Sequence, residues 1–149
     1  MCTIDFVNAA LWLIPCRVLR RVGGFSSLFY HYGEDVDFVH RLHYHGYKVG
    51  YCPVYGCHDR EQRVVTKPME HRGKSVYLLT VAADINRSAS KAFAKSYGGC
   101  LQLILQSLRQ ADWDSVSFYT RYLFRLFKDS RHIAAIRKLC TRPGSHFIE

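Results

Sequence analysis

The hydrophobic pattern of this chain changes near residue 62, and the change limits what the chain can fold into. Residues 4–14 form an almost continuous apolar run with β-branched and aromatic members, which is typical of a strand covered on both faces. From about residue 70 onward, apolar residues recur at helical spacing instead. We therefore expect two regions, residues 1–62 and residues 63–149, the second of them mainly helical.

The first region has the order strand, helix, loop, helix and strand. Pro15 ends the apolar run and suits the first turn of a short helix over residues 16–22. A second helix is expected over residues 34–45, because Gly46 is a natural cap for its end. A second strand is expected over residues 47–54. This order indicates a layered α/β unit.

In the second region we expect four helices, near residues 70–88, 90–109, 113–128 and 130–140. Asp112 and Asp114 stand at the predicted start of the third of these helices. Capping of the helix and its dipole account for this acidic pair without a metal ion. Residues from Pro143 onward are expected to be frayed.

Charge separates the same two regions. The first 62 residues carry six of the 21 basic and six of the 12 acidic residues, so the whole excess of +9 lies in the second region. No apolar run approaches the roughly 18 residues that a membrane-spanning helix needs, and the N-terminus lacks the basic-then-apolar order of a signal peptide. We expect a cytoplasmic protein, or one attached peripherally to the inner face of the membrane.

Acidic residues gather at the predicted start of the second helix, in the sequence Gly33-Glu34-Asp35-Val36-Asp37. Gly33 lets a ligand or another backbone approach closely. The helix dipole and the free N–H groups of the first turn favour acidic residues here. Asp37 and Arg41 also have the spacing of an ordinary i,i+4 pair. Taken alone, these acids are explained by helix formation.

The acids belong, however, to a longer series of short motifs. The series is Asn8-Ala9-Ala10, Val22-Gly23-Gly24-Phe25, Phe29, Tyr32-Gly33-Glu34-Asp35-Val36-Asp37-Phe38, Arg41-Leu42, Gly46-Tyr47, Pro53 and His58. In order and spacing it resembles the C-terminal part of the catalytic domain of family-2 glycosyltransferases, which have the GT-A fold. The resemblance implies an α/β fold: the C-terminal half of a GT-A nucleotide-sugar transferase followed by a mainly α-helical tail. Residues 1–62 would be the acceptor-side part of the catalytic domain, and residues 63–149 a basic helical C-terminal region.

The resemblance also implies inverting transfer of a sugar from a nucleotide-sugar donor to a glycan or lipid-linked acceptor. Such a reaction needs a base that takes the proton from the acceptor hydroxyl, and the resemblance gives this role to Asp35. Glu34 would contact the substrate and hold Asp35 in position, whereas Asp37 would brace the helix through Arg41. Further substrate contacts are implied for Asn8, Gly24, Tyr32 and Gly33.

A metal ion is implied as well. His58 matches a histidine that, in some members of the family, helps to bind the divalent ion, Mg²⁺ or Mn²⁺, that neutralises the diphosphate leaving group. A surface histidine beside Asp59 and Arg60 is the alternative. The donor-binding elements and their Asp-x-Asp metal motif do not precede the matched segment, so we expect Met1 to begin within a catalytic domain. The isolated chain is then expected to be inactive and to bind no metal.

The basic second region leaves other interpretations open. Its mixed basic and apolar helix faces suit packing on the chain's own domain, or contact with an anionic membrane surface. A basic helical module that binds nucleic acid is a rival to the enzyme, although it gives no account of the acids in the first region. A third interpretation is a non-catalytic interaction fragment. It would be a homodimer, because the truncated sheet of the first region would expose an edge strand that a second copy could cover.

Overall fold

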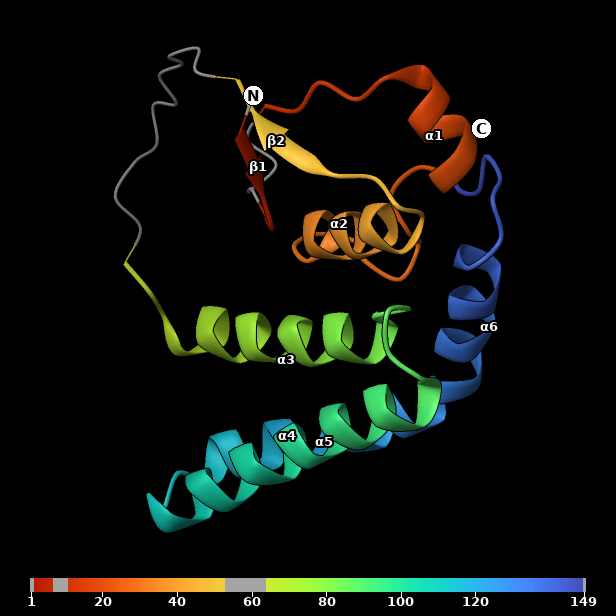
Figure 1. Ribbon diagram of the computed structural model, residues 1–149. Coiled ribbons are helices and arrows are strands. Elements are labelled where there is room, and N and C mark those ends of the chain that lie inside the picture. The colour runs from red at the N-terminus through yellow and green to blue at the C-terminus, as the bar shows by residue number, and fades with distance from the viewer. Residues whose placement is uncertain (1, 7–10, 53–63, 149) are drawn as a thin grey trace.

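The computed structural model of the chain describes residues 2–6, 11–52 and 64–148 (Figure 1). Two short strands and six helices lie within these ranges. The strands are β1 (Cys2–Ile4) and β2 (Val49–Tyr51). The helices are α1 (Cys16–Val22), α2 (Glu34–Tyr44), α3 (Lys67–Ala83), α4 (Ala89–Arg109), α5 (Trp113–Lys128) and α6 (Ser130–Cys140).

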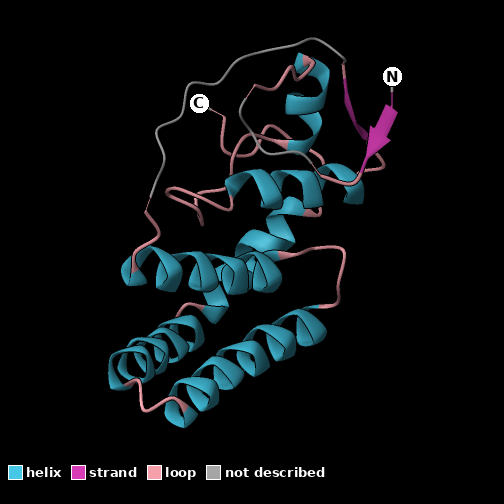
Figure 2. Ribbon diagram, turned by 90° about the vertical axis from the view of Figure 1, so that its left-hand side faces the viewer, coloured by secondary structure: helices cyan, strands magenta, loops and turns pink. Residues whose placement is uncertain are grey.

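The elements are stacked in layers that can be followed in two perpendicular views (Figure 1, Figure 2). The two strands and α1 lie at one end, α2 and then α3 follow, and the hairpin of α4 and α5 forms the opposite end. α6 runs beside this stack and returns the chain toward α1. The Gly24 N–H donates to the His146 oxygen at 2.7 Å, and the Gly144 N–H donates to the Arg21 oxygen at 2.9 Å. The expectation that the residues from Pro143 onward are frayed is therefore wrong.

The predicted fold class is wrong. The described residues form a mainly helical protein, and not an α/β unit or the C-terminal half of a GT-A fold, because their sheet has just two antiparallel strands. The register pairs Cys2 with Tyr51 and Ile4 with Val49, so each strand contributes three residues. A sheet of this size is too small to carry layers of helices on both faces.

The long first strand predicted from the apolar run is also wrong, because β1 ends at Ile4. Later in the run, Leu11 and Leu13 are 93% and 99% exposed. Trp12 and Ile14 instead pack against the buried cluster that α1 and α2 share. This part of the run therefore uses one face to cover helices, and its apolar character does not reflect burial on both faces.

The helices of the second region are close to those predicted. α5 and α6 have the predicted bounds, and α4 begins one residue early. α3 ends at Ala83 and not near residue 88, and Arg137 of α6 binds carbonyl groups at that end. The Arg137 guanidinium donates to the oxygens of Ala82 (2.7 Å) and Asp84 (2.6 Å). It thereby satisfies carbonyl groups that the end of a helix leaves free.

The two helices of the hairpin, α4 and α5, provide the surface on which α3 packs. Leu78 of α3, Cys100 of α4 and Tyr119 of α5 form one buried cluster. A Cβ added to Gly99 would lie 2.7 Å from Leu78 Cδ2, so the missing side chain lets α3 and α4 approach closely. In the part of the chain that the structure describes, no helix combines the length and apolar content needed to cross a bilayer.

Candidate functional site at the start of α2

Arg41 joins the start of the candidate site to the end of α1. Its Nε donates to Asp37 Oδ2 at 2.9 Å, one turn earlier on α2. Its Nη1 donates to the Val22 oxygen at 3.0 Å, and its Nη2 donates to the Gly24 oxygen at 2.7 Å. The guanidinium also lies over the rings of Phe38 and Phe147, with Cζ 5.1 and 5.7 Å from their centroids. One side chain therefore fixes α2 against the Gly-Gly turn.

The Asp37–Arg41 pair is buried. The exposed fractions of Asp37 and Arg41 are 4% and 1%. Burial raises the pKa of Asp37, and the positive charge and hydrogen bond of Arg41 act against that rise. Because a buried charge is costly without its partner, this pair has a structural role and is not placed to meet a substrate.

The loop before α2 contains two consecutive residues with left-handed backbone. Tyr32 has φ +69° and Gly33 has φ +86°. A Cβ added to Gly33 would lie 2.6 Å from Val76 Cγ1 and 3.1 Å from Thr80 Cγ2. Gly33 thus allows close approach, but what approaches it is the side-chain surface of α3. For Tyr32, which is not a glycine, a positive φ costs roughly 1–2 kcal/mol, and strain of this kind tends to occur at functional sites.

The Tyr32 side chain lies at the surface beside α3. It is 40% exposed, and its ring lies 5.2 Å from the Cζ of Arg72. The His31 ring is on the same side, 4.0 Å from the Tyr32 ring between centroids. An aromatic face with a cation and a second ring next to it is a surface on which a sugar ring can stack.

Glu34 and Asp35 are half-buried at the first turn of α2. Asp35 Oδ1 accepts a hydrogen bond from the Val36 N–H at 2.8 Å. Glu34 Oε2 is buried and accepts no hydrogen bond from the described residues. Within the described ranges neither carboxylate forms an ion pair. The acids are therefore of two kinds: Asp37 forms an ion pair with Arg41, whereas Glu34 and Asp35 have no ion-pair partner among the described residues.

The remaining predicted site residues are placed as follows. Both backbone polar groups of Gly24 have protein partners, the N–H with His146 and the oxygen with Arg41. A Cβ added to Gly24 would lie 2.8 Å from the Phe147 oxygen, so the C-terminal segment covers this turn. Asn8 and the predicted metal ligand His58 lie outside the described residues.

A metal site is not assembled from the described residues. Among them, no group of three or more His, Cys, Asp or Glu side chains comes together in a way that could hold a metal ion. At the Asp112 and Asp114 pair, Asp112 accepts hydrogen bonds from the Ser115 N–H (3.2 Å) and Oγ (2.7 Å). The prediction that Asp112 caps this helix is confirmed.

Some residues of the site were not expected from the sequence. Arg72, Val76 and Thr80 of α3 border Tyr32 and Gly33, and His146 and Phe147 cover the Gly-Gly turn. These residues lie about 40 to 120 positions later in the chain. Nothing in the local pattern around residues 70–80 or 146–147 distinguishes them, so only the packing of α3 and α6 reveals them.

Two shallow hollows lie elsewhere on the described surface. One, of about 310 Å³, is lined by Lys67, Pro68, His71, Asp114, Ser117, Phe118 and Arg121. The other, of about 330 Å³, lies between the loop before α2 and helices α3, α5 and α6. Neither is lined by Glu34 or Asp35.

No family model, no curated protein and no solved structure matches this chain.

Proposed function

We propose that the start of α2 is the acceptor side of a glycosyltransferase, with Asp35 as the general base. One observation carries the proposal. Glu34 and Asp35 present carboxylates without an ion-pair partner among the described residues, on a helix that the buried Asp37–Arg41 pair holds in place. A carboxylate without a cationic partner can accept a proton from a ligand hydroxyl, a role that helix capping alone does not require.

The contacts of Arg41 support treating the short motifs as one unit. The Gly-Gly-Phe turn and the Glu-Asp-x-Asp helix start are separate in the sequence, yet Arg41 binds the carbonyl of Gly24 and the carboxylate of Asp37 together. The resemblance to family-2 glycosyltransferases is used here for these residues alone, and not for the GT-A fold.

The proposed reaction is a displacement at the anomeric carbon of the donor sugar. The acceptor hydroxyl oxygen attacks the anomeric carbon of the donor sugar and forms the new glycosidic C–O bond. The old bond to the nucleoside diphosphate breaks with inversion, and the diphosphate leaves with the electron pair. Asp35 takes the hydroxyl proton as the new bond forms. Asp35 Oδ1 is held by the Val36 N–H at 2.8 Å, so Oδ2 is the oxygen that receives the proton.

Glu34 and Tyr32 have supporting roles in the proposal. Glu34, which is half-buried next to Asp35 at the first turn of α2, accepts a hydrogen bond from a second hydroxyl of the acceptor and thereby orients the first toward Asp35. Tyr32, which is 40% exposed beside Arg72, gives the sugar an aromatic side chain to contact. No step is derived through a metal ion, because no group of metal ligands is found among the described residues.

The test is saccharide binding by the chain itself. Saturation-transfer NMR with a panel of neutral mono- and oligosaccharides should show contact with the protein, at the weak affinity typical of one half of a substrate site. Glu34→Gln and Tyr32→Ser should each weaken the signal severalfold. Asp114→Asn, a substitution at a carboxylate that is 91% exposed on α5, should leave it unchanged. Absence of saccharide contact, or equal loss in all three variants, would remove the proposal.

A further inference from the structure

The outer surface of the α4–α5 hairpin carries a feature that the start of α2 does not explain. We infer that this surface binds the face of an anionic lipid bilayer. The inference is independent of the proposed function, since it concerns the opposite end of the molecule. We call the surface the hairpin face and define it by its exposed apolar residues, Leu101, Leu105, Leu108, Trp113, Phe124 and Phe127.

The α4 part of the hairpin face is a stripe of leucines. Leu101, Leu105 and Leu108 follow one another at i, i+4 and i+7, which places them on one side of the helix. They are 49%, 55% and 42% exposed. The opposite side of α4 carries Ser96, which donates to the Leu78 oxygen of α3 at 2.8 Å. The leucine stripe is therefore the side that nothing in the described structure covers.

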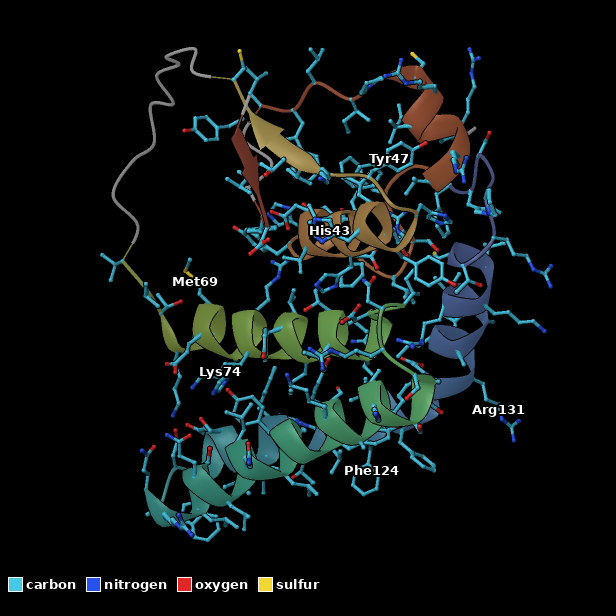
Figure 3. The ribbon with its side chains drawn as sticks, viewed as in Figure 1. His43, Tyr47, Met69, Lys74, Phe124 and Arg131 are labelled. Carbon is cyan, nitrogen blue, oxygen red and sulfur yellow. The ribbon has the colours of Figure 1, made fainter. Side chains whose placement is uncertain are left out.

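The α5 part of the face is aromatic. Phe124 and Phe127 are each 71% exposed and Trp113 is 69% exposed. The inner side of α5 carries Tyr122, whose hydroxyl donates to the Ser75 oxygen of α3 at 2.6 Å. Figure 3 shows Phe124 pointing away from α3, beyond the hairpin.

The two stripes adjoin along the line where the helices meet. The Phe127 ring lies 6.4 Å from the ring of Tyr97 on α4, measured between centroids, so the aromatic stripe of α5 borders α4. By helical spacing, the leucine stripe occupies the side of α4 next to α5. The result is one apolar strip along the hairpin, of a kind that monomeric soluble proteins rarely leave uncovered.

Basic residues flank this strip on both sides. α4 contributes Lys91, Lys95 and Arg109 and has no acidic residue, and α5 contributes Arg121, Arg125 and Lys128, all of them exposed. The single acid on the two helices is Asp114. Helical spacing places these charges beyond the apolar stripes, at the outer edges of the hairpin.

An apolar centre with basic edges matches the interface of an anionic bilayer. Such a helix lies in the plane of the interface, with aromatic and aliphatic side chains among the acyl chains and its cations among the headgroups. A second copy of the chain fits less well, because a twofold contact would bring the basic edges of both copies together. Nucleic acid also fits less well, because its phosphates would meet leucines at the centre of the face.

The binding geometry leaves the candidate site open. α2 lies on the other side of α3 from the hairpin (Figure 1, Figure 2). A bilayer that contacts the hairpin face therefore does not cover Glu34 or Asp35.

Vesicle flotation of the full chain tests the inference. The chain should float with vesicles of phosphatidylcholine containing about 30% phosphatidylglycerol. It should float at least tenfold less with pure phosphatidylcholine, and binding to the anionic vesicles should fall sharply near 1 M salt, where the Debye length is only about 3 Å. In a Trp12→Phe variant, Trp113 is the sole tryptophan, and its emission should shift to the blue on binding.

Matched substitutions distinguish binding through the hairpin face from an effect of overall charge or hydrophobicity. Phe124→Ser and Phe127→Ser should each lower the partition coefficient about tenfold, whereas Tyr77→Ser, at a tyrosine of α3 that is 60% exposed, should not. Arg121→Gln and Lys128→Gln should each lower it about fivefold. Arg17→Gln and Arg20→Gln on α1, at the other end of the molecule, should not.

Three results would overturn the inference. They are no vesicle binding, binding that is equal in neutral and anionic vesicles, and equal losses in the face variants and their controls. A salt-sensitive shift of nucleic acid without vesicle binding would assign the face to nucleic acid instead. Concentration-dependent dimerisation that Phe124→Ser abolishes, without vesicle binding, would assign it to a second copy.

Discussion

The Nη2 of Arg41 lies 2.7 Å from the carbonyl oxygen of Gly24, seventeen residues earlier in the chain. The same guanidinium holds Asp37 at 2.9 Å. The direction in which α2 presents Glu34 and Asp35 therefore depends on a contact with the Gly-Gly turn, and not on α2 alone.

Arg41→Met should lower the free energy of unfolding by roughly 3–5 kcal/mol, because it leaves the Asp37 carboxylate buried without a cation. Urea unfolding at neutral pH measures the loss. The matched control is Arg20→Met at an exposed position on α1, which should change stability by about 0.5 kcal/mol or less. Equal losses in the two variants would show that the Arg41 contacts contribute little.

The Arg41→Met deficit should also depend on pH. Burial already raises the pKa of Asp37, and Arg41 opposes the rise, so removal of Arg41 raises that pKa further. A raised carboxyl pKa in the folded state costs stability above the unfolded value and costs nothing once the group is protonated. The deficit relative to the natural chain should therefore shrink as the pH falls. A deficit that grows toward acid pH would contradict this account.

Gly33→Ala should destabilise the chain by about 2 kcal/mol or more. The backbone at Gly33 has φ +86°, and the new Cβ would lie 2.6 Å from Val76 Cγ1, so both the conformation and the packing are strained. Gly73→Ala is the matched control, because nothing lies within 4 Å of its Cβ position on α3. It should stabilise the helix by roughly 0.5–1 kcal/mol. In thermal unfolding, the melting temperature should fall for Gly33→Ala and rise for Gly73→Ala.

Asp84 should support stability above pH 4 and lose that effect in acid. Its burial acts to raise its pKa, but hydrogen bonds from the side chain and backbone of Asn86, with His40 and Arg87 nearby, lower the pKa below its usual value. Ionised Asp84 therefore stabilises the fold above the unfolded pKa of about 3.9. This contribution disappears as the pH falls through the lower pKa of the folded state.

The corresponding measurement is urea unfolding of the natural chain and of Asp84→Asn at pH 5 and pH 3. At pH 5 the variant should be less stable by about 1–2 kcal/mol, and at pH 3 the gap should be smaller. A gap that is constant with pH would mean that ionisation of Asp84 does not contribute.

Asp35→Asn should lower the transfer rate between about 100-fold and 10,000-fold in any preparation in which this chain transfers sugar, because a general base contributes that much. Affinity for the nucleotide-sugar donor should stay within a few-fold. Asp114→Asn, at the equivalent second position of α5, is the control. Unchanged turnover in Asp35→Asn would show that another residue is the base.

The sequence predicted local structure well where the signal was local. The Gly-Gly pair ends α1 at Val22, with Gly23 at φ +87°, and Asp112 caps α5. Helix-ending glycines and capping side chains act within a few residues of the helix end, so a short pattern is enough to reveal them.

Prediction failed where the outcome depends on distant contacts. Ile4 ends β1 and Trp12 covers helices, although both belong to one apolar run that predicts a single strand. The carbonyl groups at the end of α3 are bound by Arg137, which is more than 50 residues away in the sequence. The pattern of apolar residues shows which side chains favour burial, but it does not show which partner will cover them.

The most direct test of the proposed site is amide chemical-shift mapping of the isotope-labelled chain with a saccharide that binds it. The largest shift changes should occur at Tyr32, Glu34 and Asp35, and Asp35→Asn should alter them while the fold is retained. Two results would contradict the proposed site: shift changes confined to the residues that line the hollows beside α5, or shift changes spread over the chain but absent from the start of α2.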